Sequence, residues 1–448
     1  MLFLKKFHFF VKSGAKLQLF SVILQTGNKK IPNFIKMKQY LAFFAACAVM
    51  SLGAQAEEIT EVAVAPEVQN EVAEAVAAPE VGTDAPEPAG FLTGMLNNAV
   101  EKALPQNDPV DEKMEYGRST VKWATAPKFG GYAIGKYAYS GKGSGSNTFS
   151  ARLIRAYVDG TILKDFKYRL QVEMQNDAPG PHVKDFFVSW SHWKELEIKV
   201  GQFKRAFTFE NPYNPWDVGV GDYSQLVKKL AGFSDYIGTE AGNTGGRDQG
   251  IQVQGDVLPV GKDKHRLFHY QLGVYNGQGI NHADANKQKD VIGTLQVQPI
   301  KDLYVGFFGW TGNATYSNVT VRRERYAFGV KYEHNAWTVR GEYAHSTGHK
   351  IADYNATTNT WGGTGSADAW YATVGVPCTK WLKVYGKYDV FRDGGKWGKS
   401  TTIYSICPNF QLHKNLMFQL QYNFVNDRTL AAGKHNYNEL WVETYFRF

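Results

Sequence analysis

The sequence predicts an all-β protein: a 16-stranded antiparallel transmembrane β-barrel with an inward-folded third loop, preceded by a disordered acidic tether. Three observations lead to this fold class. Polar and apolar residues alternate with a period of two through most of residues 116–448, and short turns alternate with longer loops in the same region. A typical export signal precedes this region. No stretch after residue 56 contains 18 consecutive apolar residues, which excludes helical membrane spans from that part of the chain.

Charge divides the chain into three segments. Residues 1–56 contain eight lysines and no acid, residues 57–115 contain 14 acids against two lysines, and residues 116–448 contain 40 basic against 28 acidic residues. We therefore expect an export segment, an acidic low-complexity periplasmic segment and a basic β-barrel, in that order.

The first segment ends in a predicted secretory signal peptide. Met37 begins a short positive region, the apolar run 40–52 follows, and Ala54-Gln55-Ala56 is a small-x-small cleavage site. We expect translation to start at Met37, with residues 1–36 lying upstream, and the signal peptide to be cleaved after Ala56. Together with the barrel pattern, this predicts the outer membrane of a Gram-negative bacterium and contact with its lipid.

The acidic segment 57–115 is rich in Val, Ala, Pro and Glu up to residue 88 and has little bulky apolar surface to offset the entropy of ordering. We expect it to be disordered in the periplasm. Apolar residues at helical spacing over 91–104 predict a possible short helix there, either within a linker or as a contact for a partner.

The strand pattern starts near Lys128 and is clearest at the end of the chain. Leu440, Val442, Thr444, Phe446 and Phe448 share one face of the last strand, and the alternating residues share the other face. Seven short turns are predicted at 164–165, 192–194, 259–265, 299–302, 334–336, 379–380 and 413–415. Eight longer loops are predicted at 140–147, 176–182, 204–248, 277–288, 313–319, 347–366, 393–399 and 428–435. These connections give sixteen strands, with both ends of the barrel sequence on the short-turn side, which is periplasmic in such barrels.

Aromatic residues near strand ends suit a membrane interface, where such rings are enriched. They include Trp190, Trp193, Trp381, Tyr422 and Trp441. The final Phe448, inside an amphipathic strand, resembles the signal that outer-membrane proteins present to the barrel-assembly machinery. We expect that machinery to recognise it.

The third long loop, residues 204–248, is the longest of the predicted loops and carries eleven aromatic, proline and leucine residues from Phe207 to Tyr236. A long loop of this composition is usually functional rather than solvated. We expect it to fold into the barrel and narrow it, with a short helix over Leu226–Leu230.

The segments flanking this loop resemble a known family. Val200-Gly201-Gln202-Phe203-Lys204 leads into it and the run from Arg247 to Gly255 leads out of it, and both resemble the phosphate-selective porins O and P. The resemblance implies a homotrimeric porin whose constriction loop and lumen hold basic residues that bind anions such as phosphate. Carried over to this sequence, the constriction candidates are Lys204, Arg205, Lys228, Lys229 and Arg247.

The strand alternation places further basic residues on the polar face, where cations select anions by replacing part of their hydration. These lumen candidates are Arg155, Arg169, Lys199, Arg323, Arg325, Lys331, Arg340, Lys383 and Lys387. For each arginine, an ion pair across the barrel wall is the alternative to contact with an anion. The third loop carries five basic and six acidic residues and is therefore nearly neutral, unlike a strictly phosphate-selective loop.

Other functions find less support. A general or sugar-passing porin without strong anion selectivity is the main alternative, followed by a barrel enzyme or an adhesin. His269 and His345 could face the lumen, but neither lies in a recognisable motif with a nucleophile, so we predict no enzyme. We also predict no cofactor and no metal site. No nucleic-acid partner is expected, because the basic residues are dispersed. Cys378 and Cys407 are expected to be free thiols, since they lie two strands apart.

Overall fold

The computed structural model describes residues 126–174, 181–238, 244–316 and 318–448. The predicted signal peptide, the acidic segment 57–115 and the possible helix over 91–104 lie outside these residues. They remain predictions.

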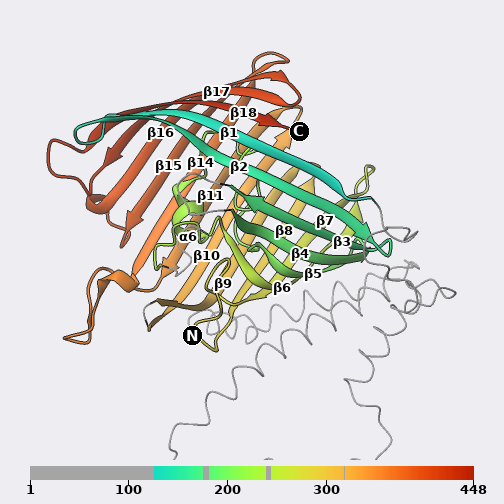
Figure 1. The fold of residues 1–448 in the computed structure, drawn as a ribbon, viewed down its shortest axis with the longest axis horizontal. Helices are drawn as coiled ribbons and strands as arrows, with labels where there is room; N and C mark the ends of the chain where they lie inside the picture. The colour runs from blue at the N-terminus through green and yellow to red at the C-terminus, as the bar shows by residue number, and fades with distance from the viewer. Residues whose placement is uncertain (1–125, 175–180, 239–243, 317) are drawn as a thin grey trace, which may run out of the picture. The chain divides into compact units, whose positions relative to one another are not determined.

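Within the described residues, sixteen strands close into one antiparallel barrel (Figure 1). Each strand pairs with its neighbours in the sequence, and β1 closes the ring against β18. The strands are β1 Lys128–Ser140, β2 Ser146–Ile162, β3 Phe166–Glu173, β4 His182–Trp193, β5 Leu196–Lys204, β6 Arg247–Val260, β7 His265–Tyr275, β8 Asp290–Ile300, β9 Leu303–Tyr316, β10 Val319–His334, β11 Trp337–Thr347, β14 Ser366–Pro377, β15 Leu382–Asp393, β16 Ser400–His413, β17 Leu416–Asp427 and β18 Asn436–Arg447. The predicted fold class is confirmed.

The seven short turns lie at one end of the barrel, as the sequence predicted. One predicted long loop, 313–319, is wrong. β9 continues to Tyr316 and β10 begins at Val319, because the pairing of Thr315 with Thr320 extends the hairpin beyond the rest of the wall. The loop between β11 and β14 instead contains structure of its own: 3₁₀ helix η2 Ile351–Asp353 and the hairpin of β12 Tyr354–Asn355 with β13 Thr360–Trp361. A second 3₁₀ turn, η3 Trp397–Lys399, precedes β16.

The two faces of each strand differ as expected for a barrel with a polar interior. On β17, Met417, Gln419, Gln421 and Asn423 are buried inside, whereas Leu416, Tyr422 and Phe424 are exposed outside. Large apolar side chains are exposed on the outer face of strands all around the ring, for example Phe186, Phe307, Phe328 and Ile406. Such a band suits acyl chains.

Two side chains do not take the roles that the sequence suggested for them. Trp441 lies on the inner face of β18, where the Lys136 ammonium is 3.3 Å from its ring centroid, so it does not face lipid as an interfacial ring would. His345 lies on the outer face of β11 and stacks on Tyr326, so it does not face the lumen. His269 does face inward, and its Nδ1 is 2.8 Å from Asp256.

The connection between β5 and β6 folds into the interior, where its helix α6 Gln225–Leu230 packs against β11, β14 and β15 (Figure 1). The predicted inward loop and its short helix are confirmed. The Ser224 side chain caps the helix by accepting a hydrogen bond from the Val227 amide. In the part of the chain that the structure describes, no helix is long and apolar enough to cross a membrane.

A row of small side chains makes room for the loop. The inner faces of β9, β10, β11 and β14 carry buried alanines at the level of the loop, and these belong to one apolar cluster with loop residues such as Phe207, Val218, Leu226 and Leu230. The alanines are Ala314, Ala327, Ala344, Ala367 and Ala369. The loop therefore covers one side of the inner wall and leaves the side formed by the N-terminal strands less covered.

Candidate functional site

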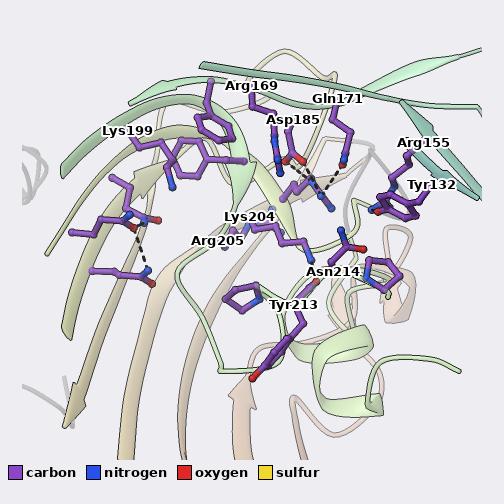
Figure 2. A pocket seen from close by; sticks show the side chains of 18 residues that line it. Tyr132, Arg155, Arg169, Gln171, Asp185, Lys199, Lys204, Arg205, Tyr213 and Asn214 are labelled. Atoms are coloured by element: carbon purple, nitrogen blue, oxygen red, sulfur yellow. Dashed lines mark hydrogen bonds and ion pairs between the residues drawn. The ribbon is translucent and has the colours of Figure 1, made fainter. Parts of the chain in front are cut away.

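A polar cavity of about 220 Å³ lies between the loop and the inner face of the N-terminal strands (Figure 2). Six basic side chains line it, against a single lining carboxylate, Asp185. The basic residues are Arg155, Arg169, Lys199, Lys204, Arg205 and Arg247. The loop contributes Pro212, Tyr213, Asn214 and Pro215 to the opposite wall.

The period of the strands explains how these side chains come together. Alternate residues of a strand point to the same face, so β3 presents Arg169 and Gln171 inward and β6 presents Gln252 and Gln254. Lys204 is the last residue of β5, where the chain turns into the loop.

Lys204 differs from its neighbours because, among the described residues, no carboxylate lies within ion-pair distance of its ammonium. It donates hydrogen bonds to the backbone carbonyls of Asn211 and Tyr213, both at 2.6 Å, and to the hydroxyl of Tyr223 at 3.2 Å. These neutral oxygens accept from all three N–H groups of the ammonium, so Lys204 is held without a carboxylate partner.

The arginines of the cavity are paired with carboxylates. Arg247 holds both oxygens of Asp185, at 2.7 and 3.0 Å. Arg169 holds both oxygens of Asp159 at 2.7 Å. Arg155 contacts Glu173 at 2.5 Å. Ion pairing across the wall, which the sequence left open, is therefore what the structure shows for these three residues.

Lys199 stands over aromatic rings. Its ammonium is 5.1 Å from the ring centroid of Phe187 and 5.6 Å from that of Phe203, and the carboxylate of Glu197 is 3.7 Å away. The negative faces of the two rings stabilise the ammonium where the wall excludes much of the water.

A second cluster, which we call the loop latch, ties the loop to the wall through three arginines around Trp310. Arg205, Arg323 and Arg325 lie 5.1, 4.9 and 4.5 Å from the Trp310 ring centroid. Their carboxylate partners are Asp248 for Arg205, Asp290 for Arg323, and Asp235 of the loop for Arg325.

The side chains of these three ion pairs are at most 1% exposed. Burial alone would raise the pKa of Asp235, but Arg325 and Arg323 outweigh burial and lower it to about 2. Arg205, Arg323 and Arg325 therefore hold the loop rather than present free charge, which differs from the anion contacts expected of them.

The two lysines of α6 lie away from the cavity lining. Lys228 contacts Asp222 at 2.9 Å, and this partner raises its pKa although burial would lower it. Lys229 lies 4.9 Å from the ring of Phe391 and has no carboxylate within ion-pair distance among the described residues. Burial lowers its pKa, and Lys228 adds to this effect. Of the five constriction candidates, Lys204, Arg205 and Arg247 thus share one cavity, and Lys228 and Lys229 do not.

Four lumen candidates remain. Three of them lie at the short-turn end of the barrel, and the fourth is a buried lysine. Lys331 lies 4.5 Å from the ring of Tyr304, Lys383 donates to Thr338 at 2.8 Å, and Arg340 lies 3.6 Å from Glu333. The Lys387 ammonium is held at 3.6 Å by Asp389.

Sequence reasoning did not single out several residues of the cavity. Tyr132, Gln171, Asp185, Phe187, Gln252, Gln254 and Gln271 belong to this group. Two of them follow a Gln-x-Gln pattern on β6, which places two amides on one face and could have drawn attention. Within the described residues, no group of three or more His, Cys, Asp or Glu side chains could hold a metal ion. Cys378 and Cys407 are free, as expected.

The sequence model of the phosphate-selective porins O and P matches residues 133–302, which include β5, the third loop and most strands of the cavity. The resemblance to the phosphate-selective porins O and P is confirmed. The match covers less than half of the chain, and together with the closed barrel it makes this chain similar to porins. Among curated proteins, no sequence matches the chain significantly.

Solved porin structures share the fold of this porin-like chain. The anion-selective porin from Comamonas acidovorans has a TM-score of 0.54 at 14% identity, over 72% of this chain and 100% of that one. Salmonella typhi OmpF, solved with daunomycin, has a TM-score of 0.53 at 13% identity, over 72% and 97%. The outer-membrane channel DcaP of Acinetobacter baumannii has a TM-score of 0.50 at 11% identity, over 74% and 99%. At these identities the likeness concerns the fold alone.

Proposed function

We propose that the protein gives small anions, phosphate among them, passive passage across the outer membrane through a water-filled barrel narrowed by the loop 204–248. The observation that carries this proposal is the cavity lined by six basic side chains, five of which have a carboxylate partner while Lys204 has none among the described residues. The unpaired ammonium of Lys204 stands where the loop leaves the wall, so an anion passing there gains attraction that a cation does not.

The paired arginines contribute differently from Lys204. An arginine whose fork is filled by a carboxylate contributes a weak dipolar field, because the two charges largely cancel. Selectivity should therefore depend mainly on Lys204 and Lys199, with Arg155, Arg169, Arg205 and Arg247 shaping the site. The same pairing favours the alternative of a general or sugar-passing porin, in which the charges only set a transverse field.

A salt-gradient measurement separates these two candidates. Purified protein is inserted into a planar bilayer with concentrated potassium chloride on one side, and the reversal potential is read. We expect its sign to show anion preference in the wild type, a weaker preference in Lys204→Gln, and a neutral or cation-preferring pore in Lys204→Glu. The control Lys396→Gln removes an exposed charge from the loop between β15 and β16 and should leave the potential unchanged.

A wild-type channel without anion preference would contradict the proposal and favour the general porin. Phosphate block of the chloride current then tests phosphate itself. Replacing Lys228 and Lys229 by Glu should weaken this block less than Lys204→Glu does, because Lys228 is already paired with Asp222.

The envelope features of the chain complete the proposal. We infer cleavage after Ala56, a periplasmic position for the acidic segment 57–115 and the short turns, and assembly as a homotrimer in outer-membrane lipid. The exposed apolar side chains around the barrel support contact with lipid. The C-terminal Phe448 pairs with Gly131 through two backbone hydrogen bonds of 3.0 and 3.1 Å at the β1–β18 seam, a position that suits recognition by the assembly machinery during closure.

A further inference from the structure

The cavity of Figure 2 contains more than basic groups, and its other side chains indicate a class of solute. We infer that it binds a hydroxylated organic anion about the size of one sugar ring, a sugar bearing a single carboxylate or phosphate, in preference to a bare inorganic anion. This inference rests on the proposed function, because it names the solute for the same cavity.

The first argument is size. The cavity volume of about 220 Å³ equals that of roughly seven water molecules at about 30 Å³ each. It lies just below the range of about 300–1,000 Å³ that accommodates drug-sized ligands. Orthophosphate, with five heavy atoms, would leave much of this volume to water, whereas a single sugar ring with one acidic group would occupy it.

The second argument is charge. A multiply charged inorganic anion is bound best by several free arginine forks. Here the forks of Arg169 and Arg247 each hold a carboxylate in a two-point contact, and Arg155 holds another. Lys204 alone among the lining cations has no carboxylate within ion-pair distance in the described part of the chain. One cation without a carboxylate partner suits the single charge of a carboxylate, and it gives the more highly charged group of a sugar phosphate one point of attraction.

The third argument is a row of amides across β6 and β7. The Gln254 side-chain oxygen accepts hydrogen bonds from the amide nitrogens of Gln252, at 2.5 Å, and Gln271, at 3.2 Å. Among the described residues, no side chain or backbone group accepts from the Gln254 nitrogen or donates to the Gln271 oxygen. One donor and one acceptor side by side match a hydroxyl group, which needs both. Chloride, which has no hydrogen to donate, could use only the donor.

The fourth argument is the aromatic wall. Phe187 is only partly buried and lines the cavity from the barrel, whereas the ring of the loop residue Tyr213 lies 4.5 Å from the guanidinium of Arg340. Flat apolar faces provide contact for the C–H face of a sugar ring, and they offer nothing to a fully hydrated inorganic ion. The acidic group, the hydroxyl groups and the ring face of such a solute would therefore each contact a matching part of the cavity.

The test uses the full-length protein in planar bilayers and measures how strongly added solutes block the chloride current. The solutes are gluconate, glucose 6-phosphate, acetate, orthophosphate and neutral glucose. We expect gluconate, glucose 6-phosphate or both to block at about tenfold lower concentration than the other three, since acid and hydroxyl contacts act together. The two sugar anions distinguish a carboxylate from a phosphate as the acidic group.

Two variants connect the block to the cavity. Phe187→Leu keeps the wall apolar but removes the flat ring, and should weaken the block by the sugar anions several-fold more than the block by acetate. Gln254→Leu should act in the same selective way. The control Lys396→Gln lies outside the cavity lining and should change none of the blocks.

The outcomes separate this inference from the proposed function. Anion preference with neither gluconate nor glucose 6-phosphate blocking more strongly than orthophosphate would overturn the solute class and leave the anion channel intact. Equal block by glucose and gluconate would also overturn it, because the charge would then not be recognised. A channel with no anion preference at all would overturn both.

Discussion

Replacing Asp235 of the loop latch tests whether buried ion pairs keep the loop inside the barrel. Its carboxylate accepts hydrogen bonds from Arg325 at 2.5 and 2.7 Å, and both side chains are 0% exposed. Asp235→Asn removes the negative charge of the side chain and leaves the buried guanidinium of Arg325 without that opposing charge. Breaking such a pair from one side costs about 3–5 kcal/mol, which raises the population of a detached loop by about a hundredfold to a few thousandfold.

Single-channel recording detects this change as more frequent switching between conductance levels, and limited proteolysis detects it as faster cleavage of the loop. The double variant Asp235→Leu with Arg325→Met should recover most of the wild-type behaviour, because an apolar pair can replace a buried ion pair at little cost. Asp217→Asn, at an exposed position of the same loop, is the matched control and should change stability by no more than about 0.5 kcal/mol. Wild-type switching and cleavage rates in Asp235→Asn would refute the view that this ion pair holds the loop.

Two further predictions follow from the same structure. Because the pKa of Asp235 is lowered to about 2 from 3.8, its ion pair contributes stability that is fully present above about pH 4 and is lost as the pH falls toward 2. Conductance switching should therefore stay constant from pH 8 to about pH 4 and rise only below it, and a rise already near pH 6 would contradict this. On the outer wall, Phe328→Arg should destabilise the barrel by about 2–4 kcal/mol, whereas Leu412→Arg, one residue from the end of β16, should cost about 0–1 kcal/mol. Denaturant unfolding in lipid vesicles measures both, and equal losses would argue against a membrane-facing band.

The strands and their faces could be predicted from the sequence because they depend on a local period. A residue's face follows from counting by two, and this placed Arg155, Arg169 and Lys199 inside correctly. The same counting places Trp441 on the inner face. The expectation that its ring would lie at the membrane interface came instead from its being a tryptophan near a strand end. The hairpin of β9 and β10 was missed because its length depends on pairing of Thr315 with Thr320, for which the residue types give no strong turn signal.

The partners of the inward charges could not be predicted, because they depend on strand register and on the path of the loop. Arg325 and Asp235 are 90 residues apart in sequence, and Arg205 and Asp248 are 43 apart. A count of basic and acidic residues correctly indicated a nearly neutral loop. It could not tell which arginines would hold the loop, or that Lys204 would be the cavity cation without a carboxylate partner among the described residues.

The alanine row on the inner wall has a consequence for attempts to widen the channel. Ala314, Ala327, Ala344, Ala367 and Ala369 lie beneath the loop and are at most 3% exposed. Shortening the loop would uncover a methyl-lined strip inside the tube, and narrow methyl-lined surfaces tend to shed water and block ion flow. A variant with a wider channel would therefore also need serine or threonine in place of these alanines, so that the uncovered strip of the inner wall stays hydrated.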